Sequence, residues 1–365
     1  MVKPVTEETM EFPNINIKVV GVGNAGGSIV SRIYNKIEGV QFLVFNTDVY
    51  ALRNVKADIK IQIGEKTTHG RGAGKDPEKG KFAANEDKGR ISDVLKNTHI
   101  IFLIAGLGGG TGTGGAPVIA KISKDLEALT IALVTTPFEF EGEERNKHAQ
   151  EGLENLLKNV DTLIHISNQK LFEIVEEKTT TREAFGKIDE IILRTISSIS
   201  DLIYKPNLLH IDFADIYSIV ENAGKGIVGM GYGKGEGRME KAVKETIDDP
   251  FIEKSEIMEA KNVLISITGS PDLTLKEIQD AINIIQSRIS SPSRIPGVAI
   301  DENLNDEVKI TLLATGIGKK SIIEPEKYIS KKENIFSDKE KRTETKIDID
   351  LPAWIRVEAE KKETI

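Results

Sequence analysis

Several residue types that carry familiar chemistry are absent or scarce in this chain of 365 residues. It has no cysteine, which excludes disulfides and thiolate metal sites, and its five histidines lack metal-ligand spacing, so we expect no zinc site. There is no apolar run of roughly eighteen residues, and the first residues lack a basic end followed by an apolar stretch. We therefore expect neither a membrane-spanning helix nor a signal peptide. The net charge is −8, and no large basic block lies in the body of the chain, so nucleic acid is a poor candidate for the main partner.

The first half of the chain alternates short apolar runs with amphipathic segments. We expect buried strands at residues 15–21, 40–45, 99–106, 129–136 and 161–167. We expect helices between them, at residues 80–95, 115–126 and 144–158. Apolar strands separated by helices predict a parallel sheet covered on both faces, and such sheets bind ligands at the carboxyl ends of their strands.

The second half begins with a long helical pattern at 182–204, where isoleucines recur at spacings of three and four, and Pro206 ends it. A smaller unit follows, with strands expected at 262–269, 297–300 and 307–316 and a helix at 274–289. Residues from about 318 to 347 are rich in Lys, Glu, Ser and Thr, a composition typical of a disordered linker. The chain closes with an apolar island at 348–357 that holds the only tryptophan.

Glycine is concentrated in three loops of the first half, each of which is expected to follow a strand. The run GLGGGTGTGG at 106–115 opens a predicted helix, so its backbone N–H groups and the helix N-terminus together predict a phosphate-binding loop. The stretch GVGNAG at 21–26 fits the dinucleotide pattern G-x-G-x-x-G, with Asp48 farther on, and taken alone favours a nicotinamide or flavin enzyme. Another loop, HGRGAGKDPEKG, lies at 69–80, so that in chain order 21–26 is the first loop, 69–80 the second and 106–115 the third. No P-loop sequence occurs anywhere.

The run GGGTGTGG resembles the signature loop of the tubulin/FtsZ superfamily, and its surroundings resemble the FtsZ members. Supporting stretches are FNTD at 45–48, KADIKIQIGEK at 56–66, TTPFEFEGEER at 135–145, DFADI at 212–216 and ATG at 314–316. The resemblance covers nearly everything from residue 15 to 316, plus the final island. It implies a parallel-sheet, Rossmann-like nucleotide-binding domain joined by a long central helix to a smaller α+β domain.

The same resemblance implies a function. The chain is expected to be a GTPase that polymerises head to tail into filaments of the cell-division ring, in the cytoplasm at the inner face of the membrane. Its ligands would be GTP and GDP, with Mg²⁺ held mainly through phosphates and water, so that no protein metal cage is required. The expected parts are a flexible extension (1–14), a GTP-binding domain (15–181), the central helix (182–204), a C-terminal activation domain (205–317), the linker (318–347) and a partner-docking peptide (348–357).

Residues near the nucleotide are implied by position in the family's motifs. In the first loop and after the second strand they are Gly23, Asn24, Ala25, Gly26, Gly27, Asn46 and Asp48. In the other two glycine loops they are Gly74, Gly108, Gly109, Gly110, Thr111, Gly112, Thr113 and Gly114. Farther along they are Glu141, Arg145 and Asn168.

The family assigns the base to Phe185 and Asp189, which are four residues apart and therefore share one helix face. An aromatic ring can stack on a purine, and a carboxylate can accept hydrogen bonds from both N1–H and the 2-amino group of guanine. Adenine offers no such pair of donors, so a site of this kind predicts a preference for GTP over ATP.

The hydrolytic residues are expected in HIDFADIY, at Asp212 and Asp215, with His210 where the family usually has asparagine. A helix of twenty residues spans about 30 Å, so this loop lies too far from the guanine contacts to reach its own nucleotide. It could reach one bound by a neighbour stacked head to tail, and such contacts propagate as open filaments. In the family this loop completes the neighbour's active site.

The final island, residues 348–357, resembles the peptide by which FtsZ docks onto membrane-tethering partners, and one short apolar patch does not predict direct insertion into a membrane. Three alternatives stay open from the sequence. They are a non-division cytoskeletal or segregation relative, a regulatory paralogue that hardly hydrolyses GTP, and a nicotinamide oxidoreductase using GVGNAG.

Overall fold

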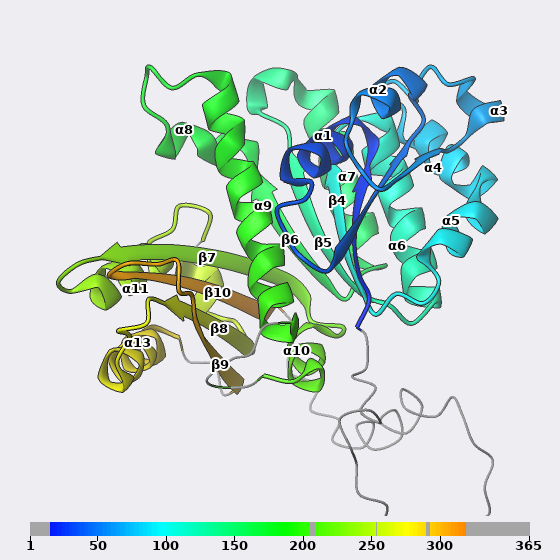
Figure 1. The fold of residues 1–365 in the computed structure, drawn as a ribbon. Helices are drawn as coiled ribbons and strands as arrows, with labels where there is room; N and C mark the ends of the chain where they lie inside the picture. Colours follow the sequence, from blue (N-terminus) through cyan, green and yellow to red (C-terminus); the bar gives the residue numbers. More distant parts are fainter. Residues whose placement is uncertain (1–14, 205–208, 210, 253, 290–292, 319–365) are drawn as a thin grey trace, which may run out of the picture. The chain divides into compact units, whose positions relative to one another are not determined.

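The computed structural model describes residues 15–204, 209, 211–252, 254–289 and 293–318. Its strands form one ten-stranded sheet in the order β3-β2-β1-β4-β5-β6-β7-β10-β8-β9 (Figure 1). The strands are β1 (Ile17–Val22), β2 (Val40–Asn46), β3 (Ile59–Gln62), β4 (Ile100–Gly106), β5 (Leu129–Thr136), β6 (Thr162–Ser167), β7 (Gly224–Lys234), β8 (Asn262–Gly269), β9 (Ser293–Ile300) and β10 (Glu307–Ile317). Strands β1 to β6 are all parallel, which confirms the predicted parallel sheet.

Helices cover both faces of the parallel half. The helices of the chain are α1 (Gly23–Ile33), α2 (Val49–Asn54), α3 (Glu65–Thr68), α4 (Pro77–Glu86), α5 (Lys88–Leu95), α6 (Ala116–Asp125), α7 (Glu143–Leu157), α8 (Leu171–Ile174), α9 (Thr181–Tyr204), α10 (Phe213–Val220), α11 (Arg238–Ile247), α12 (Lys254–Met258) and α13 (Leu275–Arg288). Alternate residues of β1 point to opposite faces. Val19 joins the core under α1 and α9, and Val20 joins the core under α5, α6 and α7.

The predicted long helix is present as α9, which runs between the two halves of the sheet (Figure 1). Its isoleucines at 188, 191, 192, 196 and 199 are buried, as their spacing predicts. Strands β6 and β7 pair in parallel over three residues only, from Thr162 opposite Gly224 to Ile164 opposite Gly226. This short ladder joins the parallel half to the second half, where β10 pairs antiparallel with β7 and β8.

Strand β7 was not predicted, because glycine is depleted in strands. It has glycine at 229, 231 and 233, on one face of the strand, and α11 lies directly over that face. A Cβ on Gly231 would stand 1.9 Å from the Ala242 carbonyl oxygen, and one on Gly233 would stand 1.8 Å from the Arg238 oxygen. The glycines therefore let the α11 backbone approach the strand. Their spacing of two residues was the sequence feature from which this strand could have been predicted.

The single helix predicted at 80–95 is wrong, because the chain breaks it at Asp87 into α4 and α5. The Asp87 carboxylate accepts a hydrogen bond from the Gly64 N–H (2.7 Å) and one from Arg90 (2.9 Å). Short polar side chains compete with the helix for backbone groups in this way. The loop at 69–80 also follows the short helix α3 and not a strand.

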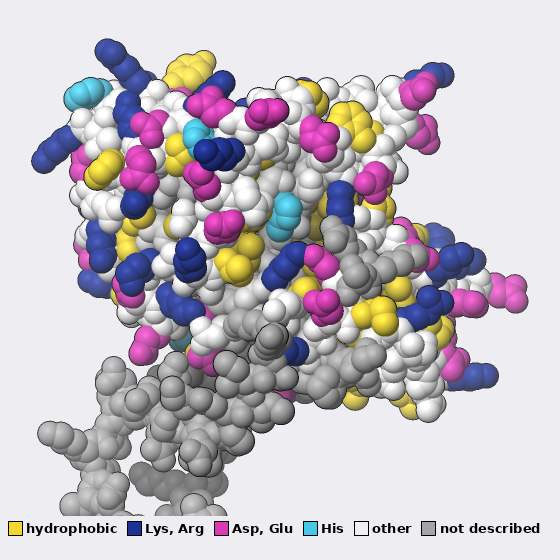
Figure 2. Space-filling model, turned by 180° about the vertical axis from the view of Figure 1, so that it is seen from behind, with side chains coloured by type: hydrophobic (Ala, Val, Ile, Leu, Met, Phe, Trp, Pro, Cys, Tyr) yellow, Lys and Arg dark blue, Asp and Glu magenta, His cyan; other side chains and the backbone are white. Residues whose placement is uncertain are grey.

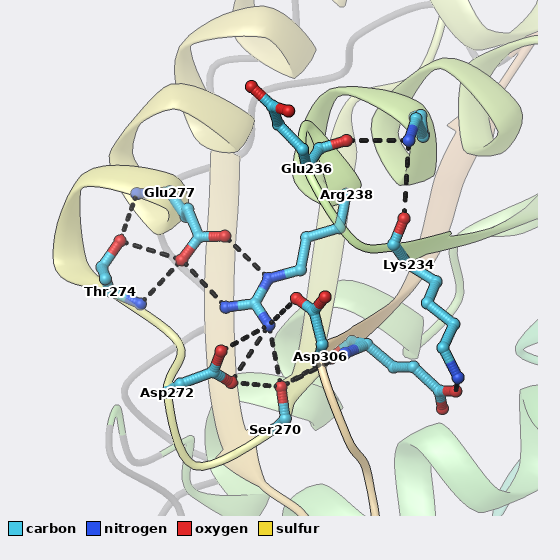
Figure 3. Close-up of polar contacts among 10 residues, drawn as sticks. Lys234, Glu236, Arg238, Ser270, Asp272, Thr274, Glu277 and Asp306 are labelled. Atoms are coloured by element: carbon cyan, nitrogen blue, oxygen red, sulfur yellow. Dashed lines mark hydrogen bonds and ion pairs between the residues drawn. The ribbon is translucent and has the colours of Figure 1, made fainter.

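A buried arginine connects two helices and two loops of the second half (Figure 3), beside a hydrophobic core formed by residues of β8, β10, α11 and α13. Arg238 of α11 is 5% exposed and donates to Glu277 of α13 (2.8 Å), to Asp272 (3.0 Å) and to Asp306 (3.1 Å). The hydrogen bond from Arg238 holds the pKa of the Glu277 carboxyl below its usual value. A buried cation needs such partners, and here they join α11 to α13 and to the loops before α13 and β10.

The surface of the described part shows no separation of charge on the face drawn in Figure 2, where basic and acidic side chains are interspersed. Among the described residues, no helix is both long and apolar enough to span a bilayer.

Candidate functional site

The strand order reverses direction between β1 and β4. From β1 the chain moves outward to β2 and β3, whereas β4, β5 and β6 follow on the other side. In open α/β sheets, ligands bind outside the carboxyl ends of the strands at such a switch point. Val22 at the end of β1 is paired with Ala105 near the end of β4, so the first and third glycine loops lie side by side. A Cβ on Gly23 would lie 3.1 Å from the Gly112 nitrogen.

Two helical segments begin at this point without side-chain caps. Helix α1 starts at Gly23 after Val22, and a π-helical turn, Thr111–Gly115, starts after Gly110 and leads into α6. Neither Val22 nor Gly110 can offer a side-chain oxygen to the free N–H groups of the first turn. Uncapped N–H groups and the helix dipole favour an anion, so the paired N-termini form a candidate phosphate site.

Most glycines of the 106–115 run face protein backbone and not open space. Cβ atoms on Gly110, Gly112 and Gly114 would stand 2.7, 2.3 and 1.8 Å from the carbonyl oxygens of Asp76, Gly106 and Pro77. In the first loop, Gly26 is similarly close to the Ile104 oxygen, at 2.3 Å. A side chain at these positions would collide with the backbone of β4, of α4 or of Asp76, which directly precedes α4. The density of glycine is therefore largely a matter of chain packing, which leaves fewer glycines to explain by a ligand.

Two predicted glycines do face open space. No atom lies within 4 Å of a Cβ built on Gly109 or on Gly74, and Gly74 has a positive φ of 63°. The Gly74 carbonyl oxygen accepts the Gly110 N–H at 2.9 Å, which brings the second and third loops together. The open space is next to Gly109, directly before the uncapped turn, and this is where a phosphate has room.

Polar side chains tie the rim of this space together. Asn46 donates to Asn24 (2.8 Å), and the Thr47 and Thr111 hydroxyls are 2.6 Å apart. Asp48 caps α2 by accepting the Ala51 N–H at 3.0 Å, so one of its oxygens has a structural role. Thr113 accepts the Gly108 N–H at 2.8 Å and thereby fixes the turn. Ala25 and Gly27 lie in the first turns of α1, and a Cβ on Gly27 would meet Val44.

The segment after β5 supplies Glu141, at the end of a 3-10 turn, and Arg145, in the first turn of α7, and the two side chains form an ion pair of 2.7 Å. Glu141 also accepts the Phe138 N–H at 3.0 Å, and a Cβ on Gly108 would lie 2.7 Å from Arg145 Cγ. Arg145 thus lies against the third glycine loop. At the end of the same strand Thr136 lies 2.8 Å from the His165 ring, and burial lowers the pKa of His165 to about 4.

The two side chains predicted for the base lie on α9, and Asn168 lies in the 3-10 turn directly after β6. Phe185 makes an edge-to-face contact with Phe138, with ring centroids 6.0 Å apart. Asn168 is 9% exposed, and its Oδ1 atom has no hydrogen-bond partner among the described residues. A buried amide oxygen without a partner is costly, so this atom favours a ligand that donates a hydrogen bond.

Asp189 has a partner that the sequence did not reveal. Both of its oxygens accept from Arg32 of α1, at 2.5 Å from Nε and 2.8 Å from Nη2. The Asp189 side chain is 13% exposed and that of Arg32 is 46% exposed. No local pattern could predict a contact between residues 157 positions apart. Thr47 could have been found, because it lies between Asn46 and Asp48 in the FNTD stretch.

The predicted hydrolytic residues lie at the opposite edge of the sheet. Phe213 packs against His99, which comes directly before β4, with ring centroids 6.4 Å apart. Strand β4 has seven residues and so puts about 23 Å between this edge and the glycine loops. Asp212 and Asp215 form a capping box at the start of α10: Asp212 accepts the Asp215 N–H (2.8 Å), and Asp215 accepts the Asp212 N–H (3.2 Å). His210, the linker and the peptide at 348–357 lie outside the described residues.

The fold defines a class of protein: a doubly wound α/β nucleotide-binding half, with strand order 3-2-1-4-5-6, that continues into a second, largely antiparallel half. Comparison with known families gives the rest. Residues 16–176 match the model of the Tubulin/FtsZ family, GTPase domain, and residues 224–318 match that of the FtsZ family, C-terminal domain. This chain therefore belongs to the FtsZ branch of the Tubulin/FtsZ family, and the predicted family and fold class are confirmed.

Individual relatives agree with this assignment. The cell division protein FtsZ of Pseudomonas aeruginosa is 41% identical over 304 residues, which are 83% of this chain and 77% of that protein. The FtsZ of Bartonella bacilliformis is 43% identical over 303 residues, 82% of this chain but 51% of that longer protein. Among solved structures, an FtsZ dimer of M. jannaschii has a TM-score of 0.78 at 40% identity and covers 85% of this chain and 90% of its own. CetZ2 of Haloferax volcanii, at 20% identity and a TM-score of 0.73, shares the fold.

Proposed function

We propose that this chain binds GTP, hydrolyses it to GDP and phosphate, and assembles head to tail into filaments that form the cell-division ring. The observation that carries the proposal is the position of two groups of residues at opposite edges of one parallel sheet. The uncapped helical turns at Gly23 and Thr111 lie at the carboxyl edge, and Asp212 and Asp215 lie at the amino edge. A site completed by a neighbour requires this arrangement.

The nucleotide would lie across the carboxyl edge. Its phosphates would accept hydrogen bonds from the N–H groups at the start of α1 and of the π-helical turn, beside the open space at Gly109. The ring of Phe185 would stack on guanine, and Asp189 would accept from N1–H and the 2-amino group. A nucleoside hydroxyl or amine would satisfy the buried Asn168 Oδ1 atom.

Magnesium fits this site as an ion held by the ligand. No group of three or more His, Asp or Glu side chains able to hold a metal occurs within the described ranges. Mg²⁺ commonly binds through phosphate oxygens and water with few protein ligands, and Asp48 is the acidic residue at the rim. When bound, the ion would neutralise charge on the phosphates.

Hydrolysis would use the capping box of a neighbouring subunit. Asp212 Oδ1 and Asp215 Oδ2 accept backbone N–H groups, which fixes the orientation of both carboxylates. The second oxygen of each remains able to accept a hydrogen bond from water. That water would attack the γ-phosphorus in line, the bond to the β–γ bridging oxygen would break, and a carboxylate would accept the proton. His210 would lie two residues away in the same loop.

The C-terminal peptide, residues 348–357, would bind a membrane-tethering division protein through its apolar residues, Leu351, Trp354 and Ile355 among them. This would hold filaments at the inner face of the membrane without direct insertion. The support for this step is the sequence alone.

The test is phosphate release from GTP, with ATP as control, over a range of protein concentrations. Specific activity that rises above a threshold concentration, for GTP only, supports a site shared between subunits. Activity independent of concentration would overturn the shared site. Tight GTP binding without release would instead favour the weakly hydrolysing paralogue, and His210→Asn would be measured next.

A further inference from the structure

The Asp189 carboxylate, which is proposed to bind guanine, already forms an ion pair with Arg32. Arg32 donates from Nε to one oxygen of Asp189 and from Nη2 to the other, which is the parallel, bidentate geometry of an arginine–carboxylate pair. Guanine would present its own two parallel donors, N1–H and the 2-amino group, to the same pair of oxygens. A carboxylate has a single edge on which both oxygens can be bound side by side.

We infer that Arg32 competes with guanine for Asp189 and so sets the strength and selectivity of base recognition. This inference rests on the proposed function, because it assumes that a guanine nucleotide binds at Asp189. In the free protein Arg32 neutralises a carboxylate that is only 13% exposed and would otherwise lack a counter-ion. When guanine binds, Arg32 must leave at least one oxygen.

Arg32 is suited to exchange. It is in the last turn of α1, its side chain is 46% exposed, and its contact with Asp189 joins α1 to α9. Within the part of the chain that the structure describes, the guanidinium has no other polar partner. The arginine end of the pair is accessible to water, so a ligand that replaces both of its hydrogen bonds to Asp189 can displace it. The freed guanidinium would return to water and would not be left buried.

The consequence is a difference between two nucleotides. Inosine diphosphate has N1–H but lacks the 2-amino group, so it needs one oxygen of Asp189, and Arg32 can keep the other. Guanosine diphosphate needs both oxygens. Removing Arg32 therefore strengthens the binding of GDP more than that of IDP, and the ratio of the two dissociation constants, IDP over GDP, increases.

The experiment measures GDP and IDP binding to the nucleotide-free full-length chain by calorimetry, for the wild type and Arg32→Gln. Lys36→Gln is the matched control, because it removes the same charge from an exposed residue just beyond α1. Either substitution weakens phosphate attraction equally for both nucleotides, so the ratio is insensitive to it. We expect the ratio to increase about two- to fivefold in Arg32→Gln, as the loss of an ion pair with one partner exposed to water allows, and to stay constant in Lys36→Gln.

An unchanged ratio in Arg32→Gln would overturn the inference. A lower ratio would also overturn it and would make Arg32 a residue that positions Asp189 for guanine. Arg32→Lys keeps the charge but cannot form the parallel pair, and we expect a smaller increase than in Arg32→Gln. If the wild type binds neither nucleotide, the proposed function itself fails, whereas GDP binding with an unchanged ratio defeats the competition alone.

Discussion

Two neighbouring glycines of the third loop should respond in opposite ways to the same substitution. A methyl group on Gly114 would stand 1.8 Å from the Pro77 carbonyl oxygen and 2.7 Å from the Lys81 nitrogen, both of them backbone atoms of α4. On Gly115 the nearest atom, the Gly80 oxygen, is 3.6 Å away, an ordinary van der Waals distance. The two residues therefore form a matched pair.

The magnitudes follow from packing. Overpacking usually costs about 1–3 kcal/mol, and Gly114→Ala should fall at or above the upper end because the whole of α4 must move. At about 2–4 °C per kcal/mol for a domain of this order of size, the melting temperature should decrease by about 6 °C or more. Gly115→Ala should be neutral or stabilise by up to about 1 kcal/mol, because alanine is the better helix former.

Thermal unfolding followed by circular dichroism, without nucleotide and at one protein concentration, distinguishes the two variants. Equal melting temperatures for Gly114→Ala and Gly115→Ala would refute the argument that close backbone contact explains the glycine run. A decrease in Gly115→Ala alone would show that the turn is strained and not crowded.

Four further outcomes are expected. Gly109→Ala puts a methyl group into open space, so the melting temperature should not change. The affinity for GDP should fall roughly five- to hundredfold, because the methyl group would crowd the bound phosphate. An unchanged affinity would show that Gly109 does not line the site. Asp189→Asn should weaken GDP binding about ten- to hundredfold, because charge-assisted hydrogen bonds to the base are lost. The adjacent Glu190→Gln breaks an exposed ion pair with Arg194 and should leave GDP binding unchanged. Equal effects of the two substitutions would contradict base recognition by Asp189. Asp212→Asn keeps a residue that caps a helix well, so GDP affinity and the melting temperature should not change. The rate of phosphate release should fall about 10²–10⁴-fold, because a proton acceptor is lost. An unchanged rate would show that Asp212 only caps α10. His165 has a folded-state pKa of about 4, below its unfolded value, so the unfolded chain binds more protons than the folded chain between pH 4 and 6.5. The free energy of unfolding should therefore decrease by up to about 3 kcal/mol as the pH falls through this window. Urea titrations should show a smaller decrease in His165→Gln, and identical pH slopes for the two proteins would count against the argument.

Local patterns predicted the elements that bury a continuous apolar face. The five strands from β1 to β6 other than β3, and the helix α9, lie within a few residues of the expected bounds, because their apolar runs and isoleucine spacing need no distant partner to be recognised. Strand β7 and helix α11 escaped prediction together, because the glycines of β7 make sense only when the α11 backbone is placed on them.

The candidate site divides in the same way. The loops around Gly23, Gly74 and Gly110 could be located from the sequence, since each motif is contiguous. Two of them follow parallel strands, whose ends meet at one edge, whereas the loop around Gly74 follows α3. The pairing of Arg32 with Asp189, the orphaned oxygen of Asn168 and the use of Gly114 for packing depend on residues far apart in the chain. A family resemblance indicates which positions belong to the site, but it does not say which of their atoms already form hydrogen bonds or close contacts within the protein.

The two outer strands of the sheet limit how copies of this chain can associate. At one margin β3 has only four residues, and at the other β9 includes Pro296, which has no N–H to offer a new strand. Exposed sheet margins are otherwise templates for the addition of strands from other molecules, the usual route to sideways aggregation. In the proposed filament, where many copies would stack along one axis, margins that do not accept a further strand would keep neighbouring filaments from joining side by side.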